Sequence, residues 1–293
     1  MDTRRHILFI VNPIAGGGKA AQAAQTAVSH IDGSRYSFSV EITRQRGDAT
    51  KLALQAVAAK TDIVVAVGGD GTVNEVARAL LGTDTALGII PCGSGNGLAL
   101  HIGMPLDTVK AVRIINEGKV EAIDSGTVNG KPFFCTMGVG YDAKVAYEYA
   151  QAGTRGMITY VREAVTWWTR YEPEEYTVFT EEETLKVKAL LITCANANQW
   201  GNNCHIAPDA SISDGLLDIT IVHPVSIPQG LRLASQLPGH SLNSNANVTS
   251  LRSASVRIER AAPDVAHYDG EAYIEEAVLD VKSVPASLKA IIP

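Results

Sequence analysis

The spacing of apolar residues divides the chain into two parts. From the N-terminus to about residue 125, short apolar runs alternate with stretches in which apolar residues recur every three or four positions. The first pattern is typical of buried strands and the second of amphipathic helices, so the alternation predicts βαβ units around a parallel sheet. The expected strands are Ile7–Val11, Tyr36–Ile42, Ile63–Val67 and Ala86–Ile90, and the expected helices are Lys19–His30, Asp48–Lys60 (with Asp48 as its cap), Val73–Leu81, Gly97–Ile102 and Pro105–Asn116.

From about Lys119 onward, short strand-like runs dominate, and one helical stretch, about Tyr141 to Tyr171, interrupts them. This pattern predicts a mostly antiparallel β domain with a helical insertion and a polar loop over Gln236–Ser250. We expect domains at 1–124 and 125–284, with the segment at about 285–293 returning to the first because its end is apolar. The expected strands are Val120–Ile123, Gly126–Val128, Pro132–Met137, Glu175–Phe179, Thr184–Cys194, Leu217–Val222, Ser255–Glu259, Ala272–Tyr273 and Ala277–Val281.

Composition is that of an ordinary globular protein, with 46% hydrophobic and 19% charged residues in a chain of 293. The net charge of −6, without a basic block, argues against nucleic acid as the main partner. No apolar run approaches the roughly 20 residues of a membrane span, and the polar start, Met1 to His6, is unlike a signal peptide. We therefore expect a cytoplasmic protein whose four cysteines, none in a C-x-x-C pair, are reduced.

The turn Gly68-Gly69-Asp70-Gly71-Thr72 joins an expected strand to an expected helix. Glycines allow a phosphate to approach the backbone closely, and a helix N-terminus favours an anion. A carboxylate beside a phosphate is tolerated when a cation lies between them, so Asp70 indicates a nucleotide site that works with Mg²⁺. The alternative is that Asp70 only stabilises the turn.

Two further glycine turns follow expected strands. Asn12-Pro13-Ile14-Ala15-Gly16-Gly17-Gly18-Lys19 resembles a phosphate cradle, but it lacks Walker A spacing, and a flexible turn is the alternative. In Pro91–Gly97, Ser94 and Asn96 could donate hydrogen bonds to phosphate oxygens, unless this is a simple strand-to-helix connection. Ligands of parallel sheets bind beyond the carboxyl ends of the strands, where all three turns are expected.

Carboxylates also gather in the second part of the chain. Ala207–Asp218 places three of them in a loop, where oxygen ligands suit a hard cation. Asp269 and Glu271 flank a glycine in a tight turn, which is either a surface β-turn or the position of a general base. Asp124, at the expected domain junction, is a further candidate for organising Mg²⁺ or water.

Together and in this order, the five turns resemble the diacylglycerol kinase catalytic-domain superfamily, which includes sphingosine and ceramide kinases. The matching sequences are N-P-I-A-G-G-G-K at 12–19, G-G-D-G-T-V-N-E-V at 68–76, P-C-G-S-G-N-G-L-A at 91–99, A-P-D-A-S-I-S-D-G-L-L-D at 207–218 and D-G-E at 269–271. The resemblance implies an ATP- and Mg²⁺-dependent lipid kinase that phosphorylates a hydroxyl of diacylglycerol, a sphingoid base or a similar lipid. It also implies a nucleotide-binding α/β domain like that of NAD kinases and 6-phosphofructokinases, followed by a lipid-binding β-sandwich.

The resemblance assigns roles to residues by motif. Asp70 and Asp124 would act through Mg²⁺ and water, and either Asp269 or Glu271, with Glu271 favoured, would deprotonate the lipid hydroxyl. The Asp214 carboxylate and the carbonyls of Ser211 and Leu216 would hold a structural Mg²⁺. The residues expected to contact ATP are Asn12, Pro13, Ile14, Ala15, Gly16, Thr43, Gly68, Gly69, Asp70, Gly71, Thr72, Val73, Asn74 and Ser94.

Several alternatives stay open. Gly93–Ala99 is closer to the G-S-G-N-A-L-A of sphingosine kinases than to the motif of many bacterial diacylglycerol kinases, which favours sphingoid bases or other long-chain alcohols as acceptors. The rival readings are a kinase of a soluble NAD-type or sugar substrate and a non-catalytic nucleotide-binding regulator. A lipid substrate implies peripheral contact with the inner membrane face, and the family makes a homodimer a reasonable expectation. The helical stretch carries residues that suit a membrane interface, Lys144, Arg155, Arg162, Trp167, Trp168 and Arg170, but the favoured interpretation is an ordinary amphipathic helix packed on the β domain.

Overall fold

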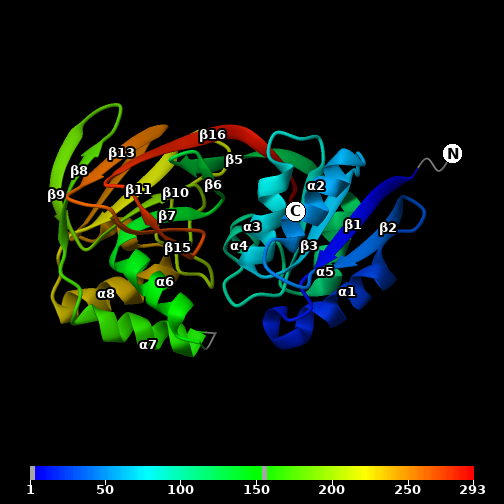
Figure 1. The fold of residues 1–293 in the computed structure, drawn as a ribbon, viewed down its shortest axis with the longest axis horizontal. Helices are drawn as coiled ribbons and strands as arrows, with labels where there is room; N and C mark the ends of the chain where they lie inside the picture. The colour runs from blue at the N-terminus through cyan, green and yellow to red at the C-terminus, as the bar shows by residue number, and fades with distance from the viewer. Residues whose placement is uncertain (1–3, 154–156) are drawn as a thin grey trace. The chain divides into compact units, whose positions relative to one another are not determined.

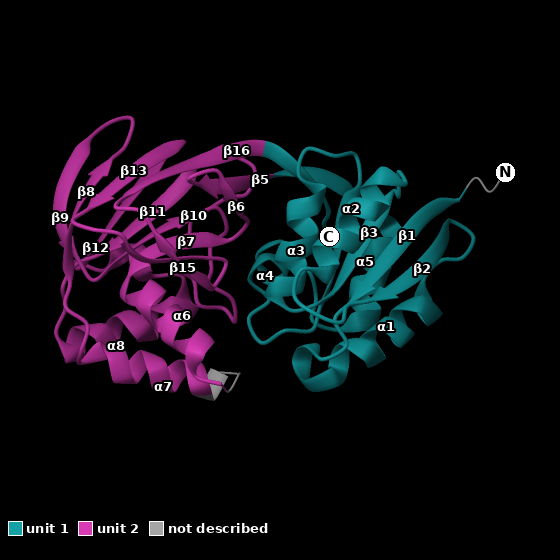
Figure 2. Ribbon diagram, viewed as in Figure 1, with its two compact units in different colours: residues 1–123, 286–293 teal, residues 124–285 magenta. Residues whose placement is uncertain are grey.

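The computed structural model describes residues 4–153 and 157–293 (Figure 1). The expectations placed on Met1 to Thr3 and on Arg155 lie outside these described residues. The chain divides into two compact units, residues 1–123 with 286–293 and residues 124–285 (Figure 2). Two strands, β5 (Val120–Val128) and β16 (Val278–Ile291), begin in one unit and end in the other.

The first unit is an α/β domain whose sheet has the strand order β2-β1-β3-β4-β16. The pairings among β1 to β4, and that of Ala290 in β16 with Leu87 in β4, are parallel. The strands are β1 (Arg5–Val11), β2 (Tyr36–Ile42), β3 (Ile63–Gly68) and β4 (Ala86–Pro91), and the helices are α1 (Lys19–His30), α2 (Asp48–Ala58), α3 (Asp70–Leu80), α4 (Gly97–His101) and α5 (Thr108–Glu117), with a 3₁₀ turn at Ala15–Gly18.

This strand order creates a topological switch point between β1 and β3. The chain leaves β1 toward β2 on one side and leaves β3 toward β4 on the other, so right-handed crossovers place α1 and α2 on opposite faces of the sheet. Ligands of doubly wound sheets bind at such a point, outside the carboxyl ends of the strands. The turns that follow β1 and β3 are the glycine-rich turns that begin at Asn12 and at Gly68.

Three expectations about helix starts in the first unit were wrong, and one of them concerns α5, which begins at Thr108 rather than at Pro105. Helix α3 begins at Asp70, three residues before the expected Val73, because its first turn is built by the glycine motif itself. The prediction that Asp48 caps α2 was wrong, since Gly47 occupies the cap position. The Asp48 carboxylate instead points back along the chain and accepts the N–H groups of Arg44 at 3.0 Å and Gln45 at 3.1 Å.

The second unit is an antiparallel β-sandwich. One sheet has the order β12-β11-β10-β7-β14-β15, and the other contains β16-β13-β8-β9 together with β5 and β6. Helix α6 packs on β7, β14 and β15, and α7 packs on α6. The strands are β6 (Lys131–Phe133), β7 (Thr136–Gly140), β8 (Glu174–Phe179), β9 (Thr184–Ala189), β10 (Leu191–Ala195), β11 (Leu217–Val222), β12 (Val248–Ser253), β13 (Ser255–Arg260), β14 (Asp264–Tyr268) and β15 (Glu271–Glu275), and the helices are α6 (Tyr141–Gln151), α7 (Met157–Trp168) and α8 (Ile227–Gln236), with 3₁₀ turns at Leu237–Gly239 and Leu242–Ser244.

The two sheets bury one apolar core between them. Residues from both sheets contribute, among them Phe133, Met137, Ile192, Ile258 and Tyr268. The expected strand Thr184–Cys194 divides at Leu190, so that β9 and β10 belong to different sheets of this sandwich. Alternation alone does not indicate such a corner, because both halves carry strand-like residues.

Candidate functional site

Three turns at the carboxyl edge of the first unit's sheet pack directly against one another. The Asn12 N–H donates to the Val67 carbonyl at 3.0 Å, and its side-chain amide donates to Thr72 Oγ1 at 3.3 Å. The Cys92 N–H donates to the Gly68 carbonyl at 2.7 Å. The turns after β1, β3 and β4 therefore form one cluster at the switch point of the sheet.

The glycines of this cluster are of two kinds. A Cβ at Gly16, whose φ is +62°, would lie 2.3 Å from the Cys92 carbonyl oxygen, and one at Gly93 would lie 2.6 Å from the Gly69 Cα. These glycines are required because backbone packs on backbone. A Cβ at Gly17 or at Gly71 would meet no described atom within 4 Å. The open side of the cluster is therefore where a ligand could approach the main chain.

Asp70 joins two of these turns. Its Oδ2 accepts the Asn96 N–H at 2.8 Å and its Oδ1 accepts the Gly97 N–H at 2.7 Å. Asp70 thereby satisfies backbone donors at the start of α4, as a capping carboxylate does. A carboxylate can accept about four hydrogen bonds, so these two leave it able to bind a water molecule or a cation as well. The turn-stabilising role and the cation-binding role are compatible.

The remaining predicted contacts in the first unit differ in accessibility. Ile14 is 81% exposed and Ser94 is exposed, whereas Val73 and Asn74 are buried in α3. The Thr43 N–H donates to the Val11 carbonyl at 2.9 Å, which places Thr43 beside the turn after β1. Pro13 and Ala15 are half-buried in that turn.

Two polar side chains have roles that sequence reasoning missed. The Asn96 side chain, expected to contact phosphate, holds its own turn by exchanging hydrogen bonds with the N–H and carbonyl of Gly93, each at 2.8 Å. Glu75 accepts the N–H groups of Gly47 at 2.9 Å and Ala49 at 3.1 Å, and so ties α3 to the start of α2. In the sequence, only the position of Glu75 within the motif at 68–76 marked this residue as a candidate.

The helices that begin at this edge offer backbone donors. Among the described residues, no side chain caps the N-terminus of α1, which follows Gly18, or that of α3, which follows Gly69. The first N–H groups of a helix have no partner within the helix, and the helix dipole favours negative charge there. The cluster thus suits an anion such as a phosphate.

In the second unit, Asp269 has a structural position. Its φ is +51°, and its carboxylate accepts three backbone N–H groups, from Phe134 at 2.9 Å, Cys135 at 2.7 Å and Thr136 at 3.3 Å. Its own N–H donates to the Thr136 carbonyl at 2.8 Å. The Asp269 side chain therefore fixes the β14–β15 turn to the start of β7.

Glu271 is the first residue of β15 and is half-buried. Its Oε2 accepts a hydrogen bond from the Tyr273 hydroxyl at 2.6 Å. The two acids of the turn are thus held differently: backbone N–H groups hold Asp269 on both of its oxygens, whereas Glu271 is bonded to a side chain.

Asp124 and the loop at 207–218 are connected. Asp124 is 3% exposed, its Oδ2 accepts the Gly215 N–H at 2.7 Å, and its N–H donates to the Ile212 carbonyl at 2.7 Å. In the same loop, the Leu216 N–H donates to Asp214 Oδ1 at 3.0 Å. The predicted metal loop is thus bonded directly to Asp124.

Arg252 neutralises the acids of this loop. It pairs with Asp214 Oδ2, and its Nε lies 3.4 Å from Asp218 Oδ1. Burial raises the pKa of Asp218, and the charges of Asp218 and Asp214 raise the pKa of Arg252 against the opposing effect of its burial. Over residues 4–153 and 157–293, no group of three His, Cys, Asp or Glu side chains is arranged to hold a metal ion.

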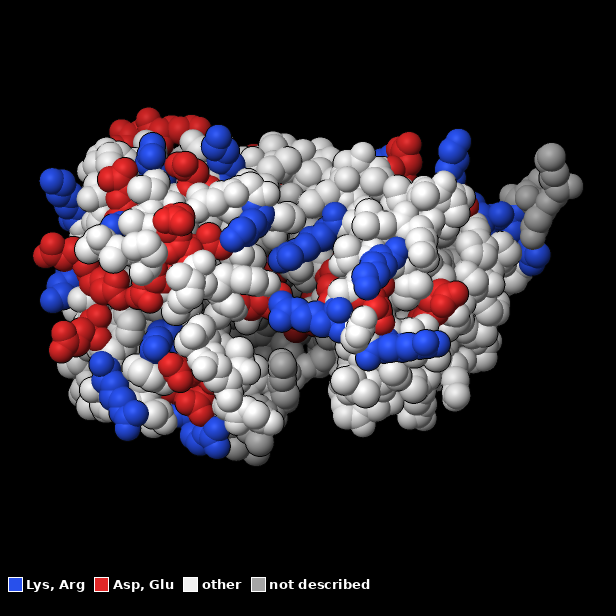
Figure 3. Space-filling view, in the orientation of Figure 1, with Lys and Arg blue, Asp and Glu red and all other residues white. Residues whose placement is uncertain are grey.

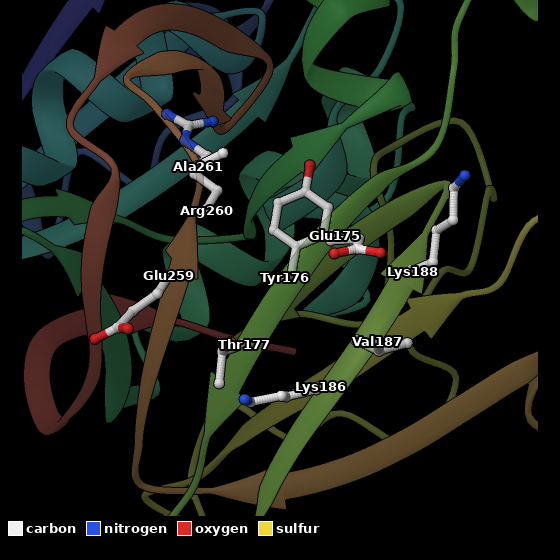
Figure 4. A pocket seen from close by; sticks show the side chains of 9 residues that line it. All are labelled: Glu175, Tyr176, Thr177, Lys186, Val187, Lys188, Glu259, Arg260 and Ala261. Carbon is white, nitrogen blue, oxygen red and sulfur yellow. The ribbon is translucent and has the colours of Figure 1, made fainter.

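One hollow of the second unit lies away from these residues. It runs along β8, β9 and β13 and is lined by Tyr176, Lys186, Lys188, Glu259 and Arg260 among others (Figure 4). None of the residues singled out from the sequence lines it. The Arg260 guanidinium is engaged by main-chain carbonyls, including that of Val265 at 2.8 Å.

Comparison with known proteins identifies the family. The diacylglycerol kinase catalytic domain matches residues 6–128, and the YegS C-terminal NAD kinase beta sandwich-like domain matches residues 135–292. The chain therefore belongs to the diacylglycerol kinase catalytic-domain family, a family of phosphotransferases.

Individual relatives agree with this assignment. A diacylglycerol kinase of Mycobacterium tuberculosis is 30% identical over 302 residues, covering 99% of this chain and 97% of that protein. A probable lipid kinase YegS-like protein of Klebsiella pneumoniae is 30% identical over 226 residues, which are 75% of each chain. A crystal structure of a putative diacylglycerol kinase from Bacillus anthracis matches 100% of this chain and 99% of its own with a TM-score of 0.79, and at 22% identity it shows the common fold.

Proposed function

We propose that this protein is an ATP- and Mg²⁺-dependent lipid kinase that transfers the γ-phosphoryl group of ATP to a lipid hydroxyl. The observation that carries the proposal is the cluster of three glycine turns joined by Asp70 at the switch point of the first unit. Uncapped helix starts and open glycines suit the phosphates of a nucleotide. The names of the relatives support a lipid as acceptor.

In this proposal the first unit binds ATP. The phosphates would be oriented by the main chain of Asn12–Gly16 and Gly68–Asn74, together with Thr43 and Ser94. Holding the phosphates in place before the reaction lowers the entropy cost of bringing the reacting groups together. In this unit we assign Asp70 to Mg²⁺ through bound water; the role with Mg²⁺ and water that the motif gives Asp124, in the second unit, stays a separate proposal. When bound with ATP, Mg²⁺ would neutralise charge on the phosphate oxygens.

We assign the general base to Glu271 rather than to Asp269. Three backbone N–H groups donate to the two oxygens of the Asp269 carboxylate, so this side chain is committed to holding the turn against β7. Glu271 would take the proton of the acceptor hydroxyl, whose oxygen forms a bond to the γ-phosphorus. The bond from that phosphorus to the β,γ-bridging oxygen breaks, and ADP leaves with the electron pair.

Transfer of phosphate from ATP to a lipid is the decisive measurement. The purified protein, incubated with γ-labelled ATP, Mg²⁺ and separate panels of lipids, NAD and sugar phosphates, is expected to label only the lipid phase. Diacylglycerol and sphingosine belong in the lipid panel because Gly93–Ala99 favours sphingoid bases whereas the relatives are named for diacylglycerol. Label in NAD or a sugar would support the soluble-substrate alternative, and no label with bound nucleotide would support a regulator.

We retain a structural Mg²⁺ site at Ser211, Asp214 and Leu216 as a proposal in which the cation competes with Arg252. Arg252→Gln removes the guanidinium from Asp214, so Mg²⁺ without nucleotide should raise the unfolding temperature more in this variant than in the unmodified protein. Arg257→Gln is the control, since Arg257 pairs with Glu259 and Asp280 on β13 and β16. The unfolding temperatures are measured by differential scanning fluorimetry with and without Mg²⁺. If Mg²⁺ raises the unfolding temperature equally in all three proteins, the proposal of a metal site here is wrong.

Membrane contact and self-association remain proposals. No helix within the described ranges combines the length and apolarity of a membrane span. Of the interfacial candidates, Lys144 lies 4.3 Å from the Trp167 ring centroid and pairs with Glu148 at 2.8 Å, so α6 and α7 use these side chains to pack on each other. On the face seen in Figure 3, cationic and anionic side chains are both present. We propose cytoplasmic location with peripheral contact at the inner membrane face, which co-sedimentation with lipid vesicles would check.

The surface we assign to a homodimer is the outer edge of β2. This strand ends the sheet order, and its alternate apolar residues Phe38, Val40 and Ile42 are 40%, 40% and 59% exposed. An antiparallel copy centred on Ser39 would place Phe38 opposite Val40 and so continue the apolar row. Sedimentation equilibrium of the protein and of Val40→Lys would check this assignment.

A further inference from the structure

We propose that Tyr273 is a positioning residue for Glu271, and that it sets the orientation in which this carboxylate accepts the proton. The inference rests on the proposed function, since it takes Glu271 as the base. Its starting observation is the 2.6 Å hydrogen bond from the Tyr273 hydroxyl to Glu271 Oε2.

The two residues share one face of the strand. Glu271 and Tyr273 are positions 1 and 3 of β15, and alternate residues of a strand point to the same side. The Glu271 side chain has three rotatable bonds and lies at the start of a strand, and an unsupported glutamate would sample many rotamers. A short bond from a phenol to one carboxylate oxygen restricts this freedom and holds the other oxygen in a defined direction.

Tyr273 is itself held rigidly. Its ring stacks on that of Tyr268, with centroids 4.4 Å apart and planes inclined by 6°. Tyr268 is 1% exposed and its hydroxyl donates to Glu275 Oε1 at 3.1 Å, while Lys131 Nζ lies 2.5 Å from the same oxygen. The Tyr273 ring is therefore supported by the buried ring of Tyr268, which is itself fixed by its hydrogen bond to Glu275. Support of this kind gives a catalytic group a fixed geometry.

Several charged side chains near Glu271 have partners of their own. Lys131 is bonded to Glu275, and its Nζ lies 6.0 Å from the centre of the Tyr273 ring. On α6, which packs on β15, Lys144 pairs with Glu148 and Asp142 pairs with His267 at 3.0 Å. The Asp269 carboxylate is bonded to backbone N–H groups. The hydrogen bond from the Tyr273 hydroxyl therefore acts on the orientation of the Glu271 carboxylate.

The chain offers a matched pair of substitutions for the test. Tyr273→Phe removes the hydroxyl at Glu271 and keeps the ring that stacks on Tyr268. Tyr268→Phe makes the same chemical change on the other ring of the stack, and removes a bond to Glu275 instead. We measure kcat and KM for the lipid, together with the unfolding temperature, for both variants and for the unmodified protein.

We expect Tyr273→Phe to lower kcat by about tenfold, with little change in KM for the lipid. Tyr268→Phe is expected to leave kcat close to that of the unmodified protein. A Tyr273→Phe variant with unchanged kcat, or an equal loss of kcat in Tyr268→Phe, overturns the inference while Glu271 remains the base. Full activity of Glu271→Gln would overturn the proposed base instead, so the two failures are distinguishable.

Discussion

Glu271→Gln is expected to abolish phosphoryl transfer while the second unit stays folded. Glutamine keeps the size of the side chain and can still accept the Tyr273 hydroxyl at its amide oxygen, but it does not take up a proton at neutral pH. General base catalysis contributes about 10² to 10⁴ in rate, so kcat should fall by at least about a hundredfold. Single-turnover transfer from labelled ATP, alongside thermal unfolding, measures both parts of this expectation.

Two other acids provide the controls. Glu276→Gln makes the same change on an exposed side chain just beyond β15 and should leave kcat unchanged. Asp269→Asn should lower thermal stability, because its carboxylate holds the N–H groups of residues 134–136 and losing such a bond costs about 1 to 3 kcal/mol. Near-normal turnover by Glu271→Gln would show that the proton is taken elsewhere.

Asp70→Asn is the second substitution with a large expected effect. The Asp70 carboxylate accepts one N–H on each oxygen, and asparagine offers one oxygen and one NH₂ group. Whichever way the amide is turned, one of its N–H groups meets the N–H of Asn96 or Gly97. The change also removes the charge that we assign to Mg²⁺. We expect a loss in kcat on the order of a hundredfold or more, with KM for ATP raised.

A helix cap in the same unit is the control for this change. Asp107 Oδ1 accepts the Lys110 N–H at 2.9 Å at the start of α5, and Asp107→Asn should be tolerated because asparagine caps helices equally well. Steady-state kinetics with lipid and circular dichroism of both variants are the measurements. If Asp70→Asn phosphorylates lipid at nearly the normal rate, neither the Asp70 charge nor its link between the two turns is required for catalysis.

The elements with strong periodicity were predictable. The α/β alternation of the first unit and the antiparallel character of the second follow from apolar spacing, and most expected strands lie within two residues of observed ones. The exceptions have physical causes. Helix α8, which the sequence analysis omitted, begins with a capping box formed by Ser226 and Gln229. The end of the expected loop Gln236–Ser250 is the start of β12, because its backbone pairs with β11.

The candidate site was predictable in part. The motifs identified the glycine turns, Asp70, Asp269 and Glu271 as candidates. They explained every glycine in the same way, by the close approach of a phosphate to the main chain. In the structure, Gly16, Gly69 and Gly93 are close to other backbone, and only some glycines face open space. Likewise the motif did not separate Asp269 from Glu271, since the difference lies in the partners that β7 and Tyr273 provide.

The sequence by itself determined the class of the two domains, the family and the order of the chemistry-bearing turns, because apolar periodicity and local turn chemistry are properties of neighbouring residues. Only the tertiary structure decided which side chains meet. Asp70 lies 26 residues before Asn96, Asp124 lies 91 before Gly215, and Asp269 lies 134 after Cys135, yet each pair shares a hydrogen bond. Such contacts depend on strand order and loop packing, which no local pattern encodes, and they are what distinguish a carboxylate that holds a turn from one that can take a proton.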